Sequence, residues 1–163
     1  MSVTPASALV SDEVRVAVGI LCNARGEVLL TRRPEHVHQG GLWEFPGGKV
    51  EAAETIQAAL RRELHEELGI TVVSARPLIR IRHAYPDKRV LLDVWRIDSY
   101  QGEPRGLESQ PLRWAVPEAL NRLHFPAADV SIINALRLPS LYLVTGDPAD
   151  RPAVFLHRLE RAL

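Results

Sequence analysis

Hydrophobic and polar residues alternate near the start of the chain, which is the pattern of a β-strand. Valines occupy every second position over residues 14–18, and a turn sequence at 23–26 precedes a second apolar run at 28–31. Two extended runs joined by a short turn with glycine are typical of a β-hairpin. We therefore expect the folded domain to begin with a hairpin. Residues 1–13, which are small and polar with nothing periodic to bury, are expected to form a flexible leader.

The pattern then changes from a loop to a helix. Residues 34–50 contain two prolines and four glycines, which predicts a loop with short extended pieces. Residues 54–68 contain neither glycine nor proline, and apolar side chains recur there at every fourth position: Ile56, Leu60, Leu64 and Leu68. This period predicts an amphipathic helix with one face against a core. Gly69 is expected to end it, because glycine readily takes a positive φ.

The rest of the chain predicts further strands and one more main helix. Strands are expected at residues 72–75, 78–83, 90–97 and 112–115, with a turn at Pro86-Asp87 and an irregular loop at 101–111. A short helix is expected at residues 117–123, with proline in its first turn, and a longer helix at 127–138. Strands gathered around two main helices favour an α/β sandwich over a doubly wound parallel sheet.

The end of the chain, residues 139–163, allows two interpretations. An apolar run at 141–144 predicts a strand, and 152–162 predicts a helix. These two elements could cap the domain. The segment LYLVTGDP also resembles the first strand and loop of a thiamine-phosphate-synthase-like barrel, which would make residues 139–163 the start of a second domain.

Composition narrows the class of protein. The 163 residues include 20 Lys+Arg and 20 Asp+Glu, so there is no basic excess for binding nucleic acid directly. The single cysteine, Cys22, excludes an internal disulfide framework and fits a reducing compartment. No apolar run approaches the roughly 18–20 residues that cross a bilayer. We expect a soluble cytoplasmic protein, monomeric, with neither a nucleic-acid nor a membrane partner.

Three carboxylates in the helix suggest chemistry. At about 100° per residue, Glu66 and Glu67 lie about 300° and 400° from Glu63, so all three share one side of the helix. Like charges at these spacings repel unless a cation lies between them, although a solvated acidic face is the structural alternative. Carboxylate oxygens select Mg²⁺, or Mn²⁺, over zinc. The preceding Gly47-Gly48 lets the backbone approach a ligand closely and supports a site here.

At every defined position, residues 48–70 resemble the Nudix box, G-x5-E-x7-R-E-U-x-E-E-x-G-U, where U is a bulky aliphatic residue. The resemblance implies a Nudix-type α/β/α sandwich with a mixed sheet and a loop-helix-loop catalytic motif. It implies metal ligands at Glu63, Glu66, Glu67 and the Gly47 carbonyl. Arg62 would orient a carboxylate, and Glu54 would support the loop.

Residues 14–138 as a whole resemble MutT-like nucleoside triphosphate pyrophosphohydrolases, through VAVGIL, LLTRRP, WEFPGGK, YPD, GEPRGLESQP and LHFPAAD in the same order. The resemblance implies hydrolysis of 8-oxo-dGTP or a related oxidised purine nucleotide to the monophosphate and pyrophosphate. It implies that a loop before the box contacts the nucleotide through Arg33, His38, Glu44, Phe45, Pro46 and Gly47. Lys49 would also bind the substrate, at the departing pyrophosphate. Glu108 would complete the metal site or assist the base. Phe45 and Tyr85 could each be a core residue or a platform for the base.

Asp129 departs from the pattern, because these enzymes usually carry asparagine there to read the oxidised purine. A carboxylate accepts hydrogen bonds and donates one only when it is protonated. An ionised Asp129 could read N1–H and the amino group of guanine, and a protonated one the 8-oxo form. Two alternatives stay open: a hydrolase of another nucleoside diphosphate derivative, and a module that senses nucleotides without cleaving them.

Overall fold

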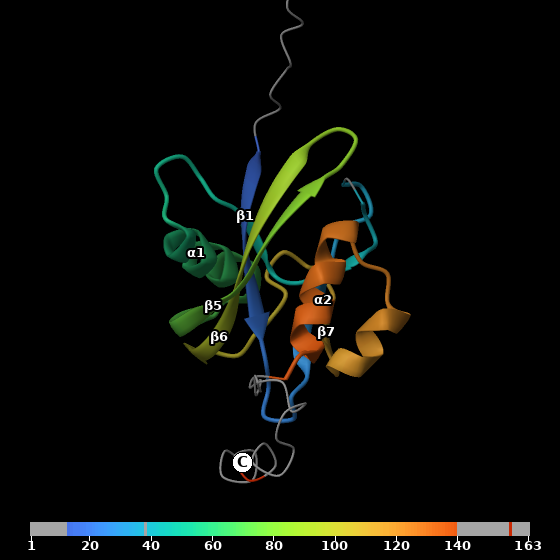
Figure 1. Cartoon of the computed structure of the whole chain (residues 1–163). Coiled ribbons are helices and arrows are strands. Elements are labelled where there is room, and N and C mark those ends of the chain that lie inside the picture. The colour runs from blue at the N-terminus through green and yellow to red at the C-terminus, as the bar shows by residue number, and fades with distance from the viewer. Residues whose placement is uncertain (1–12, 38, 140–156, 158–163) are drawn as a thin grey trace, which may run out of the picture.

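The computed structural model describes residues 13–37 and 39–139, together with His157 (Figure 1). The strands are β1 (Val14–Leu21), β2 (Val28–Arg32), β3 (Trp43–Glu44), β4 (Gly47–Lys49), β5 (Thr71–Ala84), β6 (Arg89–Gln101) and β7 (Leu112–Ala115). The α-helices are α1 (Ile56–Leu68) and α2 (Val130–Arg137), and the 3-10 helices are η1 (Pro117–Arg122) and η2 (Ala127–Asp129). The predicted leader and the strand and helix predicted after residue 139 fall almost entirely outside the described residues.

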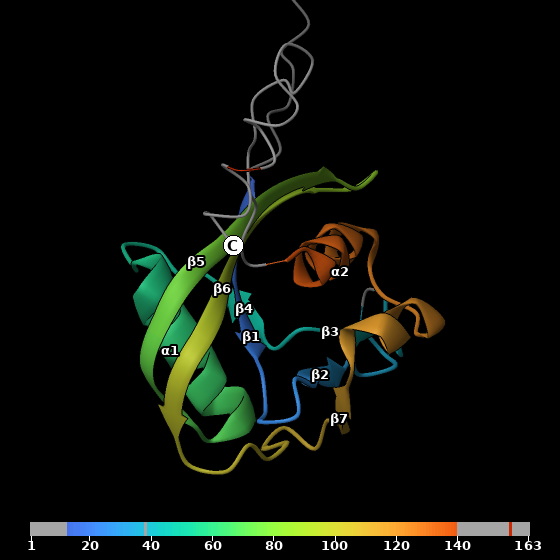
Figure 2. The same ribbon diagram turned by 60° about the horizontal axis from the view of Figure 1, so that its bottom comes forward.

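Two sheets form the framework. The larger has the order β4-β1-β6-β5, with β1 parallel to β6 and the other neighbours antiparallel. The smaller is antiparallel, with the order β3-β2-β7. α1 and α2 lie on opposite sides of the larger sheet (Figure 2). The prediction of an α/β/α sandwich with a mixed sheet is therefore confirmed.

The prediction of an N-terminal hairpin is wrong. β1 and β2 run at the predicted positions but do not pair with each other. An isolated bridge joins Cys22, just after β1, to Val28. β1 already has β4 on one side and β6 on the other, so it offers no free edge to β2. The turn at residues 23–26 instead carries the chain from one sheet to the other.

The two strands predicted at 72–75 and 78–83 are one strand, β5, with register irregularities between Val72 and Ser74 and between Pro77 and Ile79. Proline has no N–H to give to the ladder, so the pairing shifts there without ending. The predicted turn at residues 86–87 is confirmed, and Tyr85 N–H bonds the Lys88 carbonyl across it at 2.8 Å. The tip of this β5–β6 hairpin reaches η2, where Tyr85 contacts Ala128, 43 residues further along the chain, and helps to form the site described below.

α1 forms as predicted because each end is capped. The Thr55 hydroxyl accepts the Ala58 N–H at 3.2 Å, and Gly69 ends the helix at a φ of 69°. Its apolar stripe is buried against β1, where Leu64 lies so close to Gly19 that a Cβ on that glycine would be 2.8 Å away. The helix predicted at 127–138 is more irregular, since the η2 turn precedes α2.

The core has two parts, one on each face of the larger sheet. One lies under α1, and the other lies under α2 and includes Ile132 and Ile133. Among the described residues, no helix is long and apolar enough to span a membrane. Packing against the larger sheet fixes the positions of α1 and β4. The functional site is built on these two elements.

Candidate functional site

Arg62 is the centre of an ion-pair network on α1. Its guanidinium donates two hydrogen bonds to Glu54, at 2.9 and 3.0 Å, and one each to Glu63 at 2.8 Å and Glu66 at 3.1 Å. It also donates to the Lys49 carbonyl at 3.0 Å. Glu54 in turn accepts the N–H of residue 51 at 3.1 Å. One arginine therefore fixes the acidic face of α1 to the loop before it, and Glu54 holds that loop in shape.

The two glycines of β4 let this loop lie directly against the acids. Gly47 has a φ of 144°, and a Cβ there would lie 2.1 Å from the Ala17 carbonyl oxygen. A Cβ on Gly48 would lie 2.2 Å from the carboxyl group of Glu63. The Gly47 N–H donates to a Glu67 carboxylate oxygen at 3.0 Å. The pair is thus required by both backbone conformation and space.

The acids of this region repel one another. Burial raises the pKa of Glu67 to about 8, and the charges of Glu44, Glu108 and Glu63 add to this rise, while the Gly47 N–H opposes it. Burial also raises the pKa of Glu63, although Arg62 opposes the rise. Neighbouring carboxylates thus add to the effect of burial at Glu67, whereas at Glu63 Arg62 opposes it more strongly than the neighbouring carboxylates add to it.

Glu108 reaches these acids from the loop that follows β6. The loop is bonded to the end of α1, where the Leu107 N–H donates to the Glu67 carbonyl at 3.0 Å. Glu108 acts electrostatically on both Glu63 and Glu67. The carboxylate predicted from a distant part of the chain therefore lies close to those predicted on the helix.

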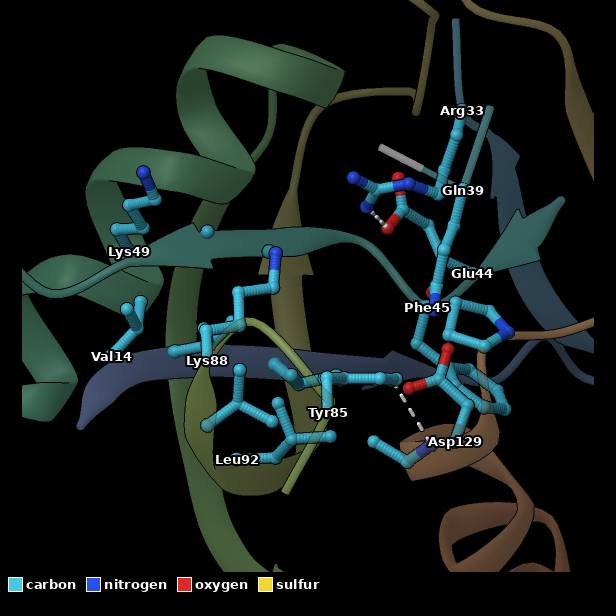
Figure 3. Close-up of a pocket in the computed structure, with 17 residues that line it drawn as sticks. Val14, Arg33, Gln39, Glu44, Phe45, Lys49, Tyr85, Lys88, Leu92 and Asp129 are labelled. Atoms are coloured by element: carbon cyan, nitrogen blue, oxygen red, sulfur yellow. Dashed lines mark hydrogen bonds and ion pairs between the residues drawn. The ribbon is translucent and has the colours of Figure 1, made fainter. Parts of the chain in front are cut away.

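A cavity of about 200 Å³ lies next to β4 (Figure 3). Its lining includes Gly47 and Gly48, the glycines that lie against Glu67 and Glu63. It is bounded by β1, β4, the loop before β4, the tip of the β5–β6 hairpin and η2. Its polar and aromatic lining residues are Arg33, Gln39, Glu44, Phe45, Lys49, Tyr85, Lys88 and Asp129. Figure 3 shows the two lysines at one end and Asp129 with Phe45 at the other. The pocket thus has a cationic end and an end with a carboxylate and aromatic rings.

Asp129 is the most buried charged residue of the pocket, with 7% of its surface exposed. Burial raises its pKa to about 7; the charge of Glu44 contributes to this rise and Arg33 opposes it. Arg33 and Glu44 form an ion pair with each other. Within the described residues the Asp129 carboxylate has no hydrogen-bond partner, so both of its oxygens remain available to a ligand.

Most of the predicted nucleotide-binding residues line this pocket: Arg33, Glu44, Phe45, Gly47, Lys49 and Asp129. Pro46 does not. Its side chain is buried outside the lining, and its carbonyl accepts the Gly19 N–H at 2.8 Å, so it anchors the loop to β1. Phe45 is both a core residue, 4% exposed, and part of the wall, where it stacks on Phe125 at 5.7 Å. His38 lies outside the described residues.

Sequence reasoning missed two polar lining residues, Gln39 and Lys88, and left Tyr85 undecided. Tyr85 and Lys88 come from the hairpin tip, and the Lys88 ammonium lies 6.0 Å from the Tyr85 ring centre. The Tyr85 hydroxyl accepts the Ala128 N–H at 3.3 Å, which joins the tip to η2. A turn sequence signals a reversal of the chain, but it carries no signal of where the tip docks.

The acids have the right chemistry for a hard divalent cation, but in this conformation they do not converge on one. Among the residues that the structure describes, no group of three or more His, Cys, Asp and Glu is placed to hold a metal ion. Arg62 binds Glu63 and Glu66, and Glu67 binds the Gly47 N–H. The donors are all oxygens, and their unrelieved repulsion is what a divalent cation would offset. The oxygen donors therefore fit such an ion, and their side chains have to change conformation to converge on it.

Comparison with known proteins agrees with this geometry. The model of the NUDIX domain matches residues 17–135, which is more than half of the chain. The chain belongs to the Nudix family. Nudix hydrolases generally use a divalent metal, and the acids of α1 lie within the matched region.

Within the Nudix family, this chain is MutT-like. It is 38% identical over 125 residues to the 8-oxo-dGTP diphosphatase of Escherichia coli K12, covering 77% of this chain and 97% of that protein. It is 33% identical over 133 residues to the CTP pyrophosphohydrolase of the same organism, covering 82% and 96%. A solved structure from a study of MutT in Aliivibrio salmonicida and Vibrio cholerae is 33% identical and has a TM-score of 0.67, covering 77% of this chain and 97% of that one. The chain is a MutT-like Nudix hydrolase.

Proposed function

We propose that this Nudix hydrolase cleaves nucleoside triphosphates to the monophosphate and pyrophosphate, with 8-oxo-dGTP or a related oxidised purine nucleotide as substrate. The observation that carries the proposal is the position of the acids of α1, next to a pocket with two lysines at one end and a buried carboxylate at the other. The triphosphate of a nucleotide needs cations around it, and the base needs hydrogen-bonding groups. The pocket offers both. The 8-oxo-dGTP diphosphatase relatives support this choice.

Glu63, Glu66 and Glu67, with the Gly47 carbonyl, would hold Mg²⁺, or Mn²⁺ as the alternative, which supplies positive charge to the phosphate oxygens. Hydrolysis of a phosphoanhydride is limited by the repulsion between the nucleophile and the charged phosphates. A positioned cation would reduce this repulsion, and a positioned base would remove the proton of the attacking water.

The side chains of the protein would supply the remaining steps. Water attacks an inner phosphorus, its proton passes to the carboxylate of Glu63 or Glu108, and the bond to the pyrophosphate oxygen breaks. Lys49 would meet the departing pyrophosphate, and Arg33 with Glu44 would contact the nucleotide. Arg62 orients Glu63 through their hydrogen bond of 2.8 Å.

The buried carboxylate of Asp129 would read the base. With a pKa near 7, it is present in both protonation states near neutral pH. The ionised form accepts from two donors, such as N1–H and the amino group of guanine, and the protonated form both donates and accepts, as the 8-oxo edge requires. A cytidine triphosphate is the second candidate, because the CTP pyrophosphohydrolase relative is 33% identical and a protonated carboxyl also suits the N3 and amino edge of cytosine.

We also propose that the protein acts as a monomer on free nucleotides in the cytoplasm. The balance of 20 basic and 20 acidic residues supports a nucleotide as the partner in preference to a nucleic acid, and the single cysteine fits a reducing compartment.

A panel of oxidised and ordinary nucleoside triphosphates, including 8-oxo-dGTP, dGTP and CTP, tests the proposal. Pyrophosphate release is measured with Mg²⁺ and with chelator added. Metal-dependent release with 8-oxo-dGTP as the preferred substrate is expected. Binding of nucleotides without release from any of them would favour the sensing module instead.

A further inference from the structure

The C-terminal end of α1 is bonded to the loop that carries Glu108. The last carbonyls of a helix have no partner within it and need donors from elsewhere. Here the Arg105 N–H donates to the Leu68 carbonyl at 3.0 Å, and the Leu107 N–H donates to the Glu67 carbonyl at 3.0 Å. The loop therefore follows the helix end through its backbone.

Gln110 adds a bond of a different kind, because its side chain joins two segments. The amide nitrogen Nε2 donates to the Glu67 carbonyl at 2.9 Å, and the amide oxygen Oε1 accepts the Glu108 N–H at 2.9 Å. One half-buried amide thus connects the backbone of a helix acid to the backbone of the loop acid, 41 positions apart in the sequence.

The loop is folded tightly around this amide. The Ser109 N–H bonds the Gly106 carbonyl at 3.2 Å, and Ser109 has a φ of 63°. A Cβ on Gly106 would lie 2.2 Å from the Gln110 carbonyl oxygen. A positive φ at a serine is unfavourable, so this loop conformation needs hydrogen bonds to stabilise it.

Electrostatics alone would move Glu108 away. Its charge opposes those of Glu63 and Glu67. Arg105, on the same loop, pairs with Glu103. Glu108 is exposed on the loop, so nothing in the packing confines it. The hydrogen bonds made by the loop are what keep this carboxylate near the helix.

We propose that Gln110 is a positioning residue that holds Glu108 in place for the hydrolytic reaction. The inference rests on the proposed function. An amide is needed because it offers a donor and an acceptor at the same time; a methionine has no donor and only a weakly accepting sulfur, and a carboxylate has no donor when ionised. Gln110 itself touches no reacting atom and acts through Glu108.

The test is a double-mutant cycle with Gln110→Met, Glu108→Gln and the double variant, using the preferred triphosphate and Mg²⁺. Gln110→Met keeps the length and shape of the side chain and removes both bonds. It is expected to lower kcat about tenfold, because small misplacements of a catalytic group are costly, with KM little changed. In the Glu108→Gln background it is expected to cause no further loss. Gln101→Met, an exposed glutamine at the end of β6, is the matched control and should act like wild type.

Three results would overturn the inference: wild-type kcat in Gln110→Met, wild-type kcat in Glu108→Gln, or an equal loss from Gln110→Met with and without Glu108. The last would mean that Gln110 only stabilises the fold. Thermal unfolding of each variant shows whether it is folded, and Gln110→Asn, one methylene shorter, replaces Gln110→Met in the cycle if the latter unfolds. Failure of the wild type to release pyrophosphate would instead reject the proposed function.

Discussion

The acidic side of the site and the base side of the pocket are built in different ways. The acids of α1 and the glycines beside them come from one continuous stretch, residues 47–67, to which Glu108 is added. The polar residues of the pocket come from six segments: the residue after β2, the loop between β2 and β3, β3, the end of β4, the tip of the β5–β6 hairpin and η2. The first arrangement follows from the local geometry of one loop and one helix, whereas the second exists only after the sheets have formed.

The charged groups are also arranged differently on the two sides. On the acidic side several carboxylates are grouped around one arginine, and their repulsion is partly unrelieved. On the base side Arg33 forms an ion pair with Glu44, and Asp129 is buried without a hydrogen-bond partner among the described residues. We therefore expect substitutions on the acidic side to affect the rate of reaction, and those on the base side to affect substrate choice and stability.

The largest effect is expected from Glu63→Gln and Glu67→Gln. Each removes a charge that the bound cation needs, so kcat should fall by about a thousandfold or more, since several kcal/mol of charge stabilisation are lost. The fold should survive, as neither carboxylate supports the core. Pyrophosphate release measures the rate, and circular dichroism the fold. Glu103→Gln, an exposed acid of the same loop as Glu108, is the control. Retained turnover in both variants would contradict the assignment.

The adjacent glycines should separate activity from folding. Gly48→Ala places a methyl group against the flexible Glu63 side chain, so kcat is expected to fall by about ten- to a hundredfold with little loss of stability. Gly47→Ala meets the Ala17 backbone and a φ of 144°, so it should destabilise the fold by roughly 1–3 kcal/mol. Kinetics and urea unfolding are measured on both. The reverse pattern would mean that the loop does not lie against α1 as described.

Asp129→Asn should change the pH dependence of stability. The pKa of Asp129 is raised to about 7 in the folded protein, against about 4 in an unfolded chain. The stability that its protonated form contributes is present below about pH 4 and is lost as the pH rises through 7. The free energy of unfolding of the variant is therefore expected to exceed that of wild type by roughly 1–3 kcal/mol at pH 8 and by almost nothing at pH 4.

Urea unfolding at the two pH values measures this difference. Asp98→Asn, which removes a surface partner of Arg76, is the control and should show little pH dependence. A gain that is the same at both pH values would contradict the burial of an ionisable Asp129. The same variant should also alter the ratio of kcat/KM for 8-oxo-dGTP and dGTP by about tenfold, since one hydrogen bond changes.

The smallest effect is expected from Tyr85→Phe. The substitution removes the hydroxyl that accepts the Ala128 N–H and so loosens the contact of the hairpin tip with η2. Stability should fall by about 0.5–1.5 kcal/mol, with a modest rise in KM and an unchanged kcat. Urea unfolding and steady-state kinetics measure the two quantities. A fall in kcat alone would place Tyr85 in the chemical step.

The sequence predicted the parts of the molecule whose geometry is local. The period of Leu60, Leu64 and Leu68 defined α1, and the spacing of its acids placed them on one side of the helix. It did not show that Arg62 would bind two of those acids, because the conformation of a long side chain depends on what surrounds it.

Properties that depend on strand order could not be predicted in this way. β1 and β2 were predicted at the right positions but as a hairpin, since alternation marks a strand without naming its neighbours. The roles of Lys88 and Gln110 were missed for the same reason, as each contacts a segment far away in the sequence. The tertiary contacts that give these residues their positions leave no local pattern.

The identity of the products tests the central claim most directly. The preferred triphosphate is hydrolysed with Mg²⁺ and followed by ³¹P NMR. The account predicts equal amounts of nucleoside monophosphate and pyrophosphate, with both absent in the Glu63→Gln variant. Formation of nucleoside diphosphate and orthophosphate, or hydrolysis that continues in Glu63→Gln, would contradict it.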